Sequence, residues 1–529
     1  MPEAASQARR SIFAEAGVSK TLEALKQDIA GLYQEDNIPW VIGYSGGKDS
    51  TSVVQLVWLA VSELPAEQRT KPVYVITTDT LVENPVVASW VNHSLKRMEE
   101  VARSESMPFH PNLLRPDLKN TFWVNLIGKG YPAPRPKFRW CTERLKIKPS
   151  NRFIQDTVSE HGEVVLLLGA RRAESAARAG AMNRAERASR DQFTYHQDLP
   201  NTLVHMPIGD WSNDDVWTFL MRVKNPWGVS NKDLMSMYRG ATEDNECPVV
   251  VDTSTPSCGN SRFGCWTCTL VDKDKSMGAM IQNDHEKEWM MPLLDIRNEL
   301  DFRGEEARQR DLERRDFRRM GGHLQYYRDQ DGEAQLIPGP YTQEAREHWL
   351  SRVLAAQRKI RDDEQAPDYV QELELISLEE LEEIRRIWIT EKHEVEDLVP
   401  RIYIEEMGEP YPGAERPVVD LFEGELLELL KEACDGNRVR YETARNLLAI
   451  ERRYQYMGAR RGLFKELEKA LRNGCFETKK EALEFKRREA EIEGDTAGAC
   501  AGRQVGVEGE SAYVVERSEA GQEQRNAVN

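Results

Sequence analysis

The 529-residue sequence lacks any excess of positive charge, since 72 Lys and Arg residues stand against 89 Asp and Glu residues. The formal net charge is −17. A protein that coats nucleic acid needs a cationic field over much of its surface. The composition therefore excludes a simple nucleic-acid coat protein and restricts any contact with nucleic acid to a local patch.

Long hydrophobic runs are also missing. The longest apolar run, Val53–Val61 with Gln55 as an interruption, falls far short of the roughly 18 residues that a membrane-spanning helix needs. Residues 1–17 mix acids with bases and contain no apolar stretch of signal-peptide length. We therefore expect a cytoplasmic protein without membrane contact, whose thiols stay reduced unless they bind metal or take part in chemistry.

The spacing of a Walker A loop, Gly-x4-Gly-Lys-Ser/Thr, is absent, but another phosphate-binding pattern is present. In VIGYSGGKDS, Val41–Ser50, an apolar strand runs directly into Ser-Gly-Gly-Lys-Asp-Ser, and a helical pattern follows at Thr51–Val61. Two adjacent glycines let the backbone amides turn inward as an anion nest, and the helix N-terminus adds partial positive charge. This order of strand, nest and helix predicts a pyrophosphate cradle.

The length indicates two or three domains. Short apolar runs at Trp40–Tyr44, Val73–Thr77 and Val164–Leu168 alternate with stretches of helical period, which predicts an α/β fold with a mostly parallel sheet. Later the pattern becomes helical, with Ser377 as an N-cap and Glu380 closing a capping box. We predict an N-terminal helical segment at 1–35, an α/β domain at 36–285, a helical extension at 286–492 and a disordered tail at 493–529.

Charge is segregated within the helical extension. Asp362–Pro410 carries 17 acids against 4 Lys and Arg, whereas Arg438–Arg472 carries 10 bases against 4 acids. The basic stretch is a candidate DNA-binding patch, but both stretches also fit ordinary solvated helix faces.

The motif SGGKDS resembles the signature of the PP-loop ATP pyrophosphatases, which split ATP between the α and β phosphates and leave AMP on the acceptor. This resemblance implies an ATP site with Mg²⁺ shared between phosphates. Lys48 would neutralise phosphate oxygens, and Asp49 would help the metal or the loop geometry. The cradle would consist of Ser45, Gly46, Gly47, Lys48, Asp49 and Ser50.

Three further segments resemble the phosphoadenosine phosphosulfate reductase family, over roughly the first 280 residues. ITTDTLVENP contains Asp79, Thr80 and Glu83; LLLGARRAESAAR contains Gly169, Arg171, Arg172, Glu174, Ser175 and Arg178; and MPIGDWSNDDVWTFL, from Met206 to Leu220, corresponds to a helix beside the site. The resemblance implies nucleotide-binding roles for Asp79, Thr80 and Gly169. Arg171 and Arg172 would stabilise charge on the phosphates, although surface salt bridges are the alternative.

Five of the eight cysteines fall in the α/β region: Cys141, Cys247, Cys258, Cys265 and Cys268. The Cys-x6-Cys-x2-Cys spacing of the last three, with glycine, serine and aromatic residues between them, is typical of a loop shaped around a metal. Thiolates favour zinc or an iron-sulfur cluster, so both remain open on spacing alone.

The family resemblance favours a 4Fe-4S cluster. In sulfate-reductase relatives a cysteine before a basic segment joins a later Cys-x2-Cys pair, which Cys141, Cys265 and Cys268 match, although Trp140 stands where those relatives have a second cysteine. We predict Cys258 as the fourth ligand. Cys247 is the alternative ligand, or else a persulfide carrier or a core thiol.

The reductase members end in Glu-Cys-Gly-x-His, and this chain has no such ending. The segment Val249–Met277 instead resembles the DNA phosphorothioation sulfurtransferases. That resemblance implies an ATP-dependent sulfurtransferase that adenylates a DNA backbone phosphate and replaces a nonbridging oxygen with sulfur. Its partners would be DNA, a cysteine desulfurase and the subunits DndD and DndE. A tRNA thiolase and a non-enzymatic DNA-binding scaffold remain alternatives.

Overall fold

The computed structural model describes residues 11–500 except 175–178, 181, 184–192, 242–262, 329–333, 395, 414–423, 456 and 458. Its centre is a six-stranded sheet in the order β3-β2-β1-β4-β6-β5. The strands are β1 Trp40–Gly43, β2 Val73–Thr78, β3 Phe109–Leu114, β4 Val164–Leu167, β5 Thr194–Tyr195 and β6 Thr202–His205. Only the edge strand β5 is antiparallel to its neighbour, so the predicted mostly parallel sheet is confirmed.

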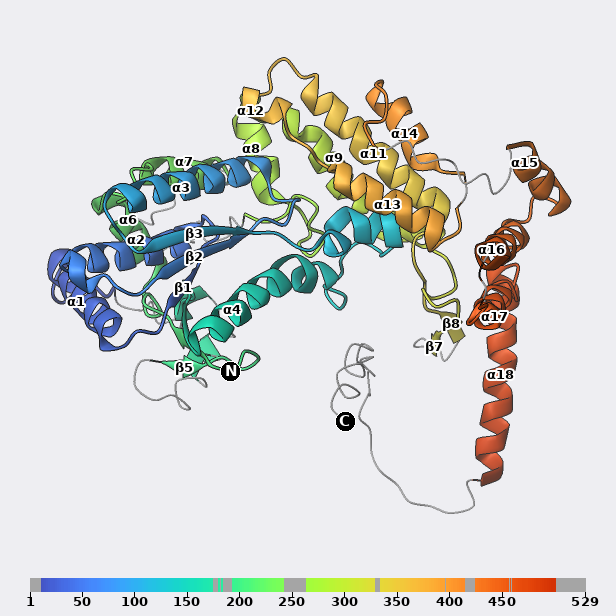
Figure 1. The fold of residues 1–529 in the computed structure, drawn as a ribbon, viewed down its shortest axis with the longest axis horizontal. Helices are drawn as coiled ribbons and strands as arrows, with labels where there is room; N and C mark the ends of the chain where they lie inside the picture. Colours follow the sequence, from blue (N-terminus) through green and yellow to red (C-terminus); the bar gives the residue numbers. More distant parts are fainter. Residues whose placement is uncertain are drawn as a thin grey trace, which may run out of the picture.

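Alternation along the strands buries both faces of this sheet. In β1, Trp40 and Ile42 join the larger core, whereas Val41 belongs to a smaller core with Val164 and Ile154. Helices cover the larger core on one face, and α4 covers the other (Figure 1). The helices of this part are α1 Val18–Glu35, α2 Lys48–Ser62, α3 Pro85–Ser104, α4 Lys148–His161, α6 Asn213–Arg222 and α7 Asn231–Gly240.

The strand order reverses at β1. From β1 the chain proceeds outward through β2 to β3, and it then returns to place β4 on the other side of β1. Loops that leave neighbouring strands in opposite directions open a crevice at their carboxyl ends, which is where open α/β sheets bind ligands. The loop after β1 is Tyr44–Gly47, so the predicted cradle lies at this switch point.

A second core lies in the helical region and extends across the predicted boundary at residue 285. Its helices are α8 Lys275–Asn283, α9 Met291–Leu300, α10 Glu305–Glu313, α11 Gln343–Arg361, α12 Asp368–Gln371, α13 Leu378–Thr390 and α14 Leu398–Met407. Two short helical turns, η3 Val124–Lys129 and η4 Thr142–Ile147, insert into it from the α/β part. Trp123 donates to the carbonyl of Leu375 at 2.7 Å, and Trp388 donates to that of Ile127 at 3.0 Å. The shared core therefore ties the two parts together, and the domain limits stay a prediction.

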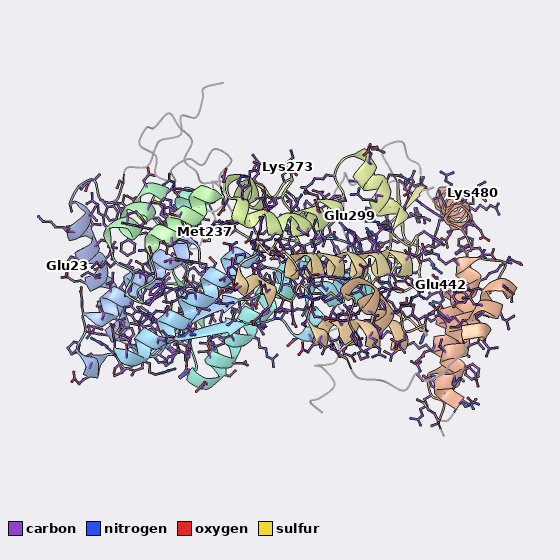
Figure 2. The ribbon with its side chains drawn as sticks, turned by 90° about the horizontal axis from the view of Figure 1, so that it is seen from above. Glu23, Met237, Lys273, Glu299, Glu442 and Lys480 are labelled. Atoms are coloured by element: carbon purple, nitrogen blue, oxygen red, sulfur yellow. The ribbon has the colours of Figure 1, made fainter. Side chains whose placement is uncertain are left out.

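The C-terminal helices form a separate column beside this core (Figure 1). They are α15 Gly424–Ala433, α16 Arg438–Gln455, α17 Leu463–Asn473 and α18 Lys479–Cys500, and a small hairpin, β7 Tyr326–Arg328 with β8 Ala334–Leu336, packs against α18. Figure 2 shows Glu442 and Lys480 at the end of the molecule far from Glu23. Helix α18 reaches into the segment predicted to be disordered, and the chain beyond Cys500 lies outside the described residues. Among the helices described, none combines the length and the apolar character needed to cross a membrane.

The predicted capping box of α13 is present, and one of its members has a strongly shifted pKa. Ser377 Oγ accepts from the Glu380 amide at 3.3 Å, and Glu380 Oε2 accepts from the Ser377 amide at 3.1 Å. Glu380 is 2% exposed, and burial raises its pKa from 4.5 to about 7. The folded state therefore holds a proton that the unfolded chain releases, so stability falls as the pH rises from about 4.5 to 7.

We expect Glu380→Gln to remove this pH dependence, because glutamine is neutral and its carbonyl oxygen can still accept from Ser377. The variant should exceed the parent in unfolding free energy at pH 8 by roughly 1 to 3 kcal/mol, with the difference shrinking toward pH 5. Thermal unfolding across this pH range measures the difference, with the exposed Glu372→Gln as control. A difference that is the same at every pH would contradict the assignment.

Candidate active site

The loop after β1 has the conformation that a glycine pair permits. Gly46 has φ +73°, and a Cβ atom there would lie 2.4 Å from Val91 Cγ2. Trp90 Nε1 donates to the Gly46 carbonyl at 3.1 Å. The backbone conformation and the closeness of helix α3 both exclude a side chain at residue 46. The hydrogen bond from Trp90 holds the loop against that helix.

The two serines close the loop onto itself. Ser50 Oγ accepts from the Ser45 amide at 3.1 Å and lies 3.1 Å from Ser45 Oγ, and it donates to the Gly47 carbonyl at 3.1 Å. Helix α2 begins at Lys48, three residues before the predicted start, so Lys48 and Asp49 lie in its first turn. Its N-terminal amides therefore point to the crevice, where they favour an anion.

Three charged side chains meet at this helix start. Lys48 Nζ lies 3.0 Å from Asp49 Oδ2, and Arg171 Nε donates to Asp49 Oδ1 at 2.6 Å. Arg171 is 3% exposed and also donates to the Trp211 carbonyl at 3.3 Å. Asp49 thus orients the Lys48 ammonium and the Arg171 guanidinium, which can then contact phosphate oxygens. The close approach requires Gly169, because a Cβ atom there would lie 3.0 Å from the Asp49 carbonyl carbon.

Arg172 is placed differently from Arg171. It donates to Asp210 at 2.7 Å and to Asn183 at 3.3 Å, and it does not line the cavity over the phosphate loop. This ion pair is the alternative that the sequence left open for the arginines. A direct role for Arg172 at the phosphates remains a prediction that this geometry does not favour.

A cavity of about 1040 Å³ opens over the loop, within the size range of small-molecule sites. Its lining includes Ser45, Gly47, Lys48, Asp49, Thr78, Asp79, Glu83, Lys146, Arg171, Glu174, His196, Asn213, Tyr238 and Phe263. Asn213 begins α6, so this helix does lie beside the site, as the family resemblance implied. The cavity therefore brings together residues from segments that are distant in sequence.

Tyr238 on α7 is a site residue that sequence reasoning missed. Its hydroxyl accepts from the Lys48 amide at 3.3 Å, and its ring lies 5.5 Å from Lys48 Nζ. Burial raises the pKa of the phenol, so it stays neutral. No local pattern marks this tyrosine, because 190 residues separate it from the loop.

In the segment after β2, some side chains line the cavity and others contact a cysteine. Asp79 lines the cavity, accepts from the Leu81 amide at 2.9 Å and pairs with Arg115 at 3.2 Å. Thr80 is fully buried instead, where it donates to Glu83 at 3.0 Å and lies 3.4 Å from Cys265 Sγ. Thr80 does not line the cavity, and its nucleotide contact stays a prediction.

Of the three predicted ligand cysteines that the structure describes, none lines the cavity, but Cys265 Sγ lies 3.9 Å from Glu83 Oε1 of its lining. Cys141 and Cys265 pack against the helical core, and the Cys268 amide donates to the Cys265 carbonyl at 3.0 Å in a tight turn. Burial raises the pKa of Cys265 to about 12, and burial also raises that of Cys141; in both, negative charge at Cys268 adds to the effect. The three thiols are thus within electrostatic range of one another.

A cation accompanies these thiols. Lys146 Nζ lies 3.3 Å from Glu83 Oε1, and its pKa is raised, chiefly by negative charge at Cys265. Within the part of the chain that the structure describes, no group of three or more potential ligands is close enough to hold a metal ion. Cys247 and Cys258, the candidates for a fourth ligand, lie outside the described residues, as do Ser175 and Arg178.

The basic stretch 438–472 lies on α16 and α17, where several of its arginines have acidic partners. Arg445 pairs with Glu396 at 3.0 Å, Arg472 with Glu468 at 2.6 Å, and Arg453 with Glu466. The exposed pairs of Arg453 and Arg472 favour the solvated-face interpretation at these two positions, whereas Arg445, which pairs with Glu396, is buried.

Comparison with known proteins agrees with this fold. Residues 39–270 match the family described as the phosphoadenosine phosphosulfate reductase domain, and residues 425–472 match a small protein found in certain Dnd DNA modification systems. The uncharacterized protein MJ0066 of Methanocaldococcus jannaschii is 29% identical over 263 residues, which are 49% of this chain and 42% of that protein. The chain therefore matches less than half the length of this relative.

One similar solved structure is the FMN adenylyltransferase of Candida glabrata in complex with FAD and inorganic pyrophosphate. It is 13% identical, the match covers 46% of this chain and 74% of that chain, and the TM-score is 0.23. The family matches are the more informative findings. By these matches, residues 39–270 are similar to the phosphoadenosine phosphosulfate reductase domain, and residues 425–472 are similar to a small protein of Dnd DNA modification systems.

Proposed function

We propose that the protein is an ATP-dependent sulfurtransferase of DNA phosphorothioation, equivalent to DndC, and acts in the cytoplasm. The observation that carries this proposal is Glu83, which lines the cavity over the phosphate loop and also lies 3.3 Å from Lys146 and 3.9 Å from Cys265 Sγ. One carboxylate thus connects the nucleotide cavity with the sulfur-bearing side. An enzyme that activates an oxygen with ATP and then delivers sulfur needs these two sites next to each other.

The first step would form the adenylate. A nonbridging oxygen of a DNA phosphate attacks the α phosphorus of ATP, the bond to the β phosphate breaks, and pyrophosphate leaves. Lys48, the loop amides and the amides of the first turn of α2 would hold the departing pyrophosphate, with Mg²⁺ compensating charge. Arg171, oriented by Asp49, would stabilise negative charge on the reacting phosphate.

The second step would transfer sulfur. The terminal sulfur of a persulfide, made by a cysteine desulfurase, attacks the DNA phosphorus, and AMP leaves with the former nonbridging oxygen. A thiol then attacks the inner sulfur, so that a disulfide forms and the sulfur remains on phosphorus as a thiophosphate. The atoms and electrons balance, because the thiol supplies the two electrons that cleave the sulfur-sulfur bond.

We propose a 4Fe-4S cluster as the group that the cysteines hold, which their spacing and the family resemblance support. Cys141, Cys265 and Cys268 supply three thiols from two segments, and we propose Cys258 as the fourth ligand, with Cys247 as the alternative. When bound, the cluster would supply sulfur ligation or electron transfer. Lys146, which is charged beside Cys265, would offset the negative charge of the thiolates.

DNA-dependent pyrophosphate release tests the proposal. With ATP, Mg²⁺, a persulfide donor and DNA, we expect pyrophosphate to form and digested DNA to contain phosphorothioate-linked dinucleotides by mass spectrometry. Thiolated nucleosides in tRNA, with unmodified DNA, would favour the tRNA thiolase. Absence of pyrophosphate with every acceptor would favour the scaffold, which leaves the loop without a function. Co-purification with DndD and DndE tests the partner assignment.

A further inference from the structure

A second cavity, of about 880 Å³, lies between the α/β part and the helical region. One wall comes from α3 and the end of β3, and the other from α12 and the start of α13. It shares Asp79, Glu83, Ala88 and Asn92 with the cavity over the phosphate loop. The two cavities are therefore neighbours with a common wall. We call this second cavity the acceptor groove.

The α3 and β3 wall of the acceptor groove carries two cations, beside the carboxylates Asp79 and Glu83. Lys96 and Arg115 are exposed on it, together with His93. Arg115 uses Nε for its pair with Asp79, and a guanidinium carries five N–H donors in all. Lys96 and the remaining donors of Arg115 can therefore contact a phosphate group of a polynucleotide, which an overall acidic protein otherwise repels.

The opposite wall has the groups that contact a nucleobase. Tyr369 is 50% exposed and presents an aromatic ring, and Glu374 and Glu379 are exposed carboxylates. Aromatic rings stack on bases of any sequence, and carboxylates accept hydrogen bonds from amino groups of bases. Cations on one side and an aromatic ring with carboxylates on the other match the two ends of a nucleotide.

The position of the acceptor groove also suits the reaction. Trp266, the residue after Cys265, forms part of its lining, while Asp79 and Glu83 open to the nucleotide cavity. A nucleotide in the groove would therefore lie next to both the ATP site and the thiols. Its volume is in the range of sites that enclose small ligands, so it accommodates one nucleotide unit rather than a duplex.

We propose that the acceptor groove binds one unpaired nucleotide of the acceptor strand, with its phosphate against Lys96 and Arg115 and its base against Tyr369. This inference rests on the proposed function and adds where the nucleic acid is held. It also requires the duplex to open locally, since a stacked and paired base cannot enter a groove of this kind.

Photocrosslinking with a single-stranded oligonucleotide that contains 5-iodouracil tests the proposal on the full chain. We expect a crosslinked peptide that contains Tyr369. Binding of a fluorescein-labelled oligonucleotide should weaken roughly 10-fold in Tyr369→Ala and in Lys96→Ala, and recover in Tyr369→Phe, which keeps the aromatic ring. Matched controls are Tyr327→Ala and Lys232→Ala, at exposed positions outside the groove. Affinity for ATP should be unchanged in all of these variants.

The outcomes separate this inference from the proposed function. Crosslinks confined to α16–α18, or unchanged oligonucleotide binding in both Tyr369→Ala and Lys96→Ala, would overturn the acceptor groove even if DNA gains sulfur. A crosslink at Tyr369 in a protein that releases no pyrophosphate with DNA would support the groove as a nucleotide site and refute the sulfurtransferase. Loss of binding in Tyr369→Phe as well would overturn stacking as its basis.

Discussion

Replacing Lys48 by alanine is expected to reduce DNA-dependent pyrophosphate release by two to three orders of magnitude, which is the usual cost of removing one preorganised group that stabilises developing charge. Lys48 lies at the start of α2, with its ammonium 3.0 Å from Asp49 and over the ring of Tyr238. The ammonium is thus held in place before ATP binds. Pyrophosphate release at saturating ATP measures the effect.

The same substitution should lower the stability of the fold only slightly, although the Lys48 side chain is mostly buried. Its side chain is 13% exposed, so alanine loses some contact with Tyr238. Lys48→Arg keeps a positive charge and should retain part of the activity, and Lys20→Ala on α1 controls for loss of a surface cation. Parental rates in Lys48→Ala would show that this loop is not the active cradle.

Single Cys→Ser substitutions at the predicted ligands are expected to abolish iron binding. Removal of one thiolate from a four-cysteine cluster opens one iron to solvent and oxidation, so each variant should lose its brown colour and most of its iron and acid-labile sulfide. The positions are Cys141, Cys258, Cys265 and Cys268. Anaerobic purification followed by iron and sulfide assays and a visible spectrum measures the result.

Two other cysteines serve as matched controls. Cys434 is buried and Cys475 is exposed, and they follow the ends of α15 and α17, so Cys434→Ser and Cys475→Ser should retain iron. Cys247→Ser should also retain iron. If that variant splits ATP but fails to place sulfur in DNA, Cys247 is the persulfide carrier; if it loses iron while Cys258→Ser keeps it, the two assignments exchange.

Zinc without iron or sulfide in the purified protein would return the site to the structural metal that spacing alone allowed. Loss of iron in Cys434→Ser would point to general instability instead of ligation. The cluster assignment is independent of the Lys48 experiment, because Lys48 lines the cavity, whereas Cys141, Cys265 and Cys268 do not.

Much of the fold follows from local patterns. Apolar runs at three strands, and the Ser377 capping box, were readable because strand alternation and caps depend on residues within a few positions of one another. The phosphate loop could be predicted for the same reason, because a few neighbouring residues define the anion nest. One of them is Gly46, whose φ of +73° favours glycine. The site of the loop at the switch point then follows from the order of strands.

The sequence by itself therefore determined the sheet, the loop and the cysteine spacing of this protein. Only the tertiary structure decided that Arg171 and not Arg172 reaches Asp49, that Tyr238 supports Lys48, and that Thr80 bonds toward Cys265. Arg171 and Arg172 are the same residue type at adjacent positions, so the local sequence does not indicate which side chain points into the site. Long-range packing selects between them, because a buried polar group must find its partner across the core, often more than a hundred residues away.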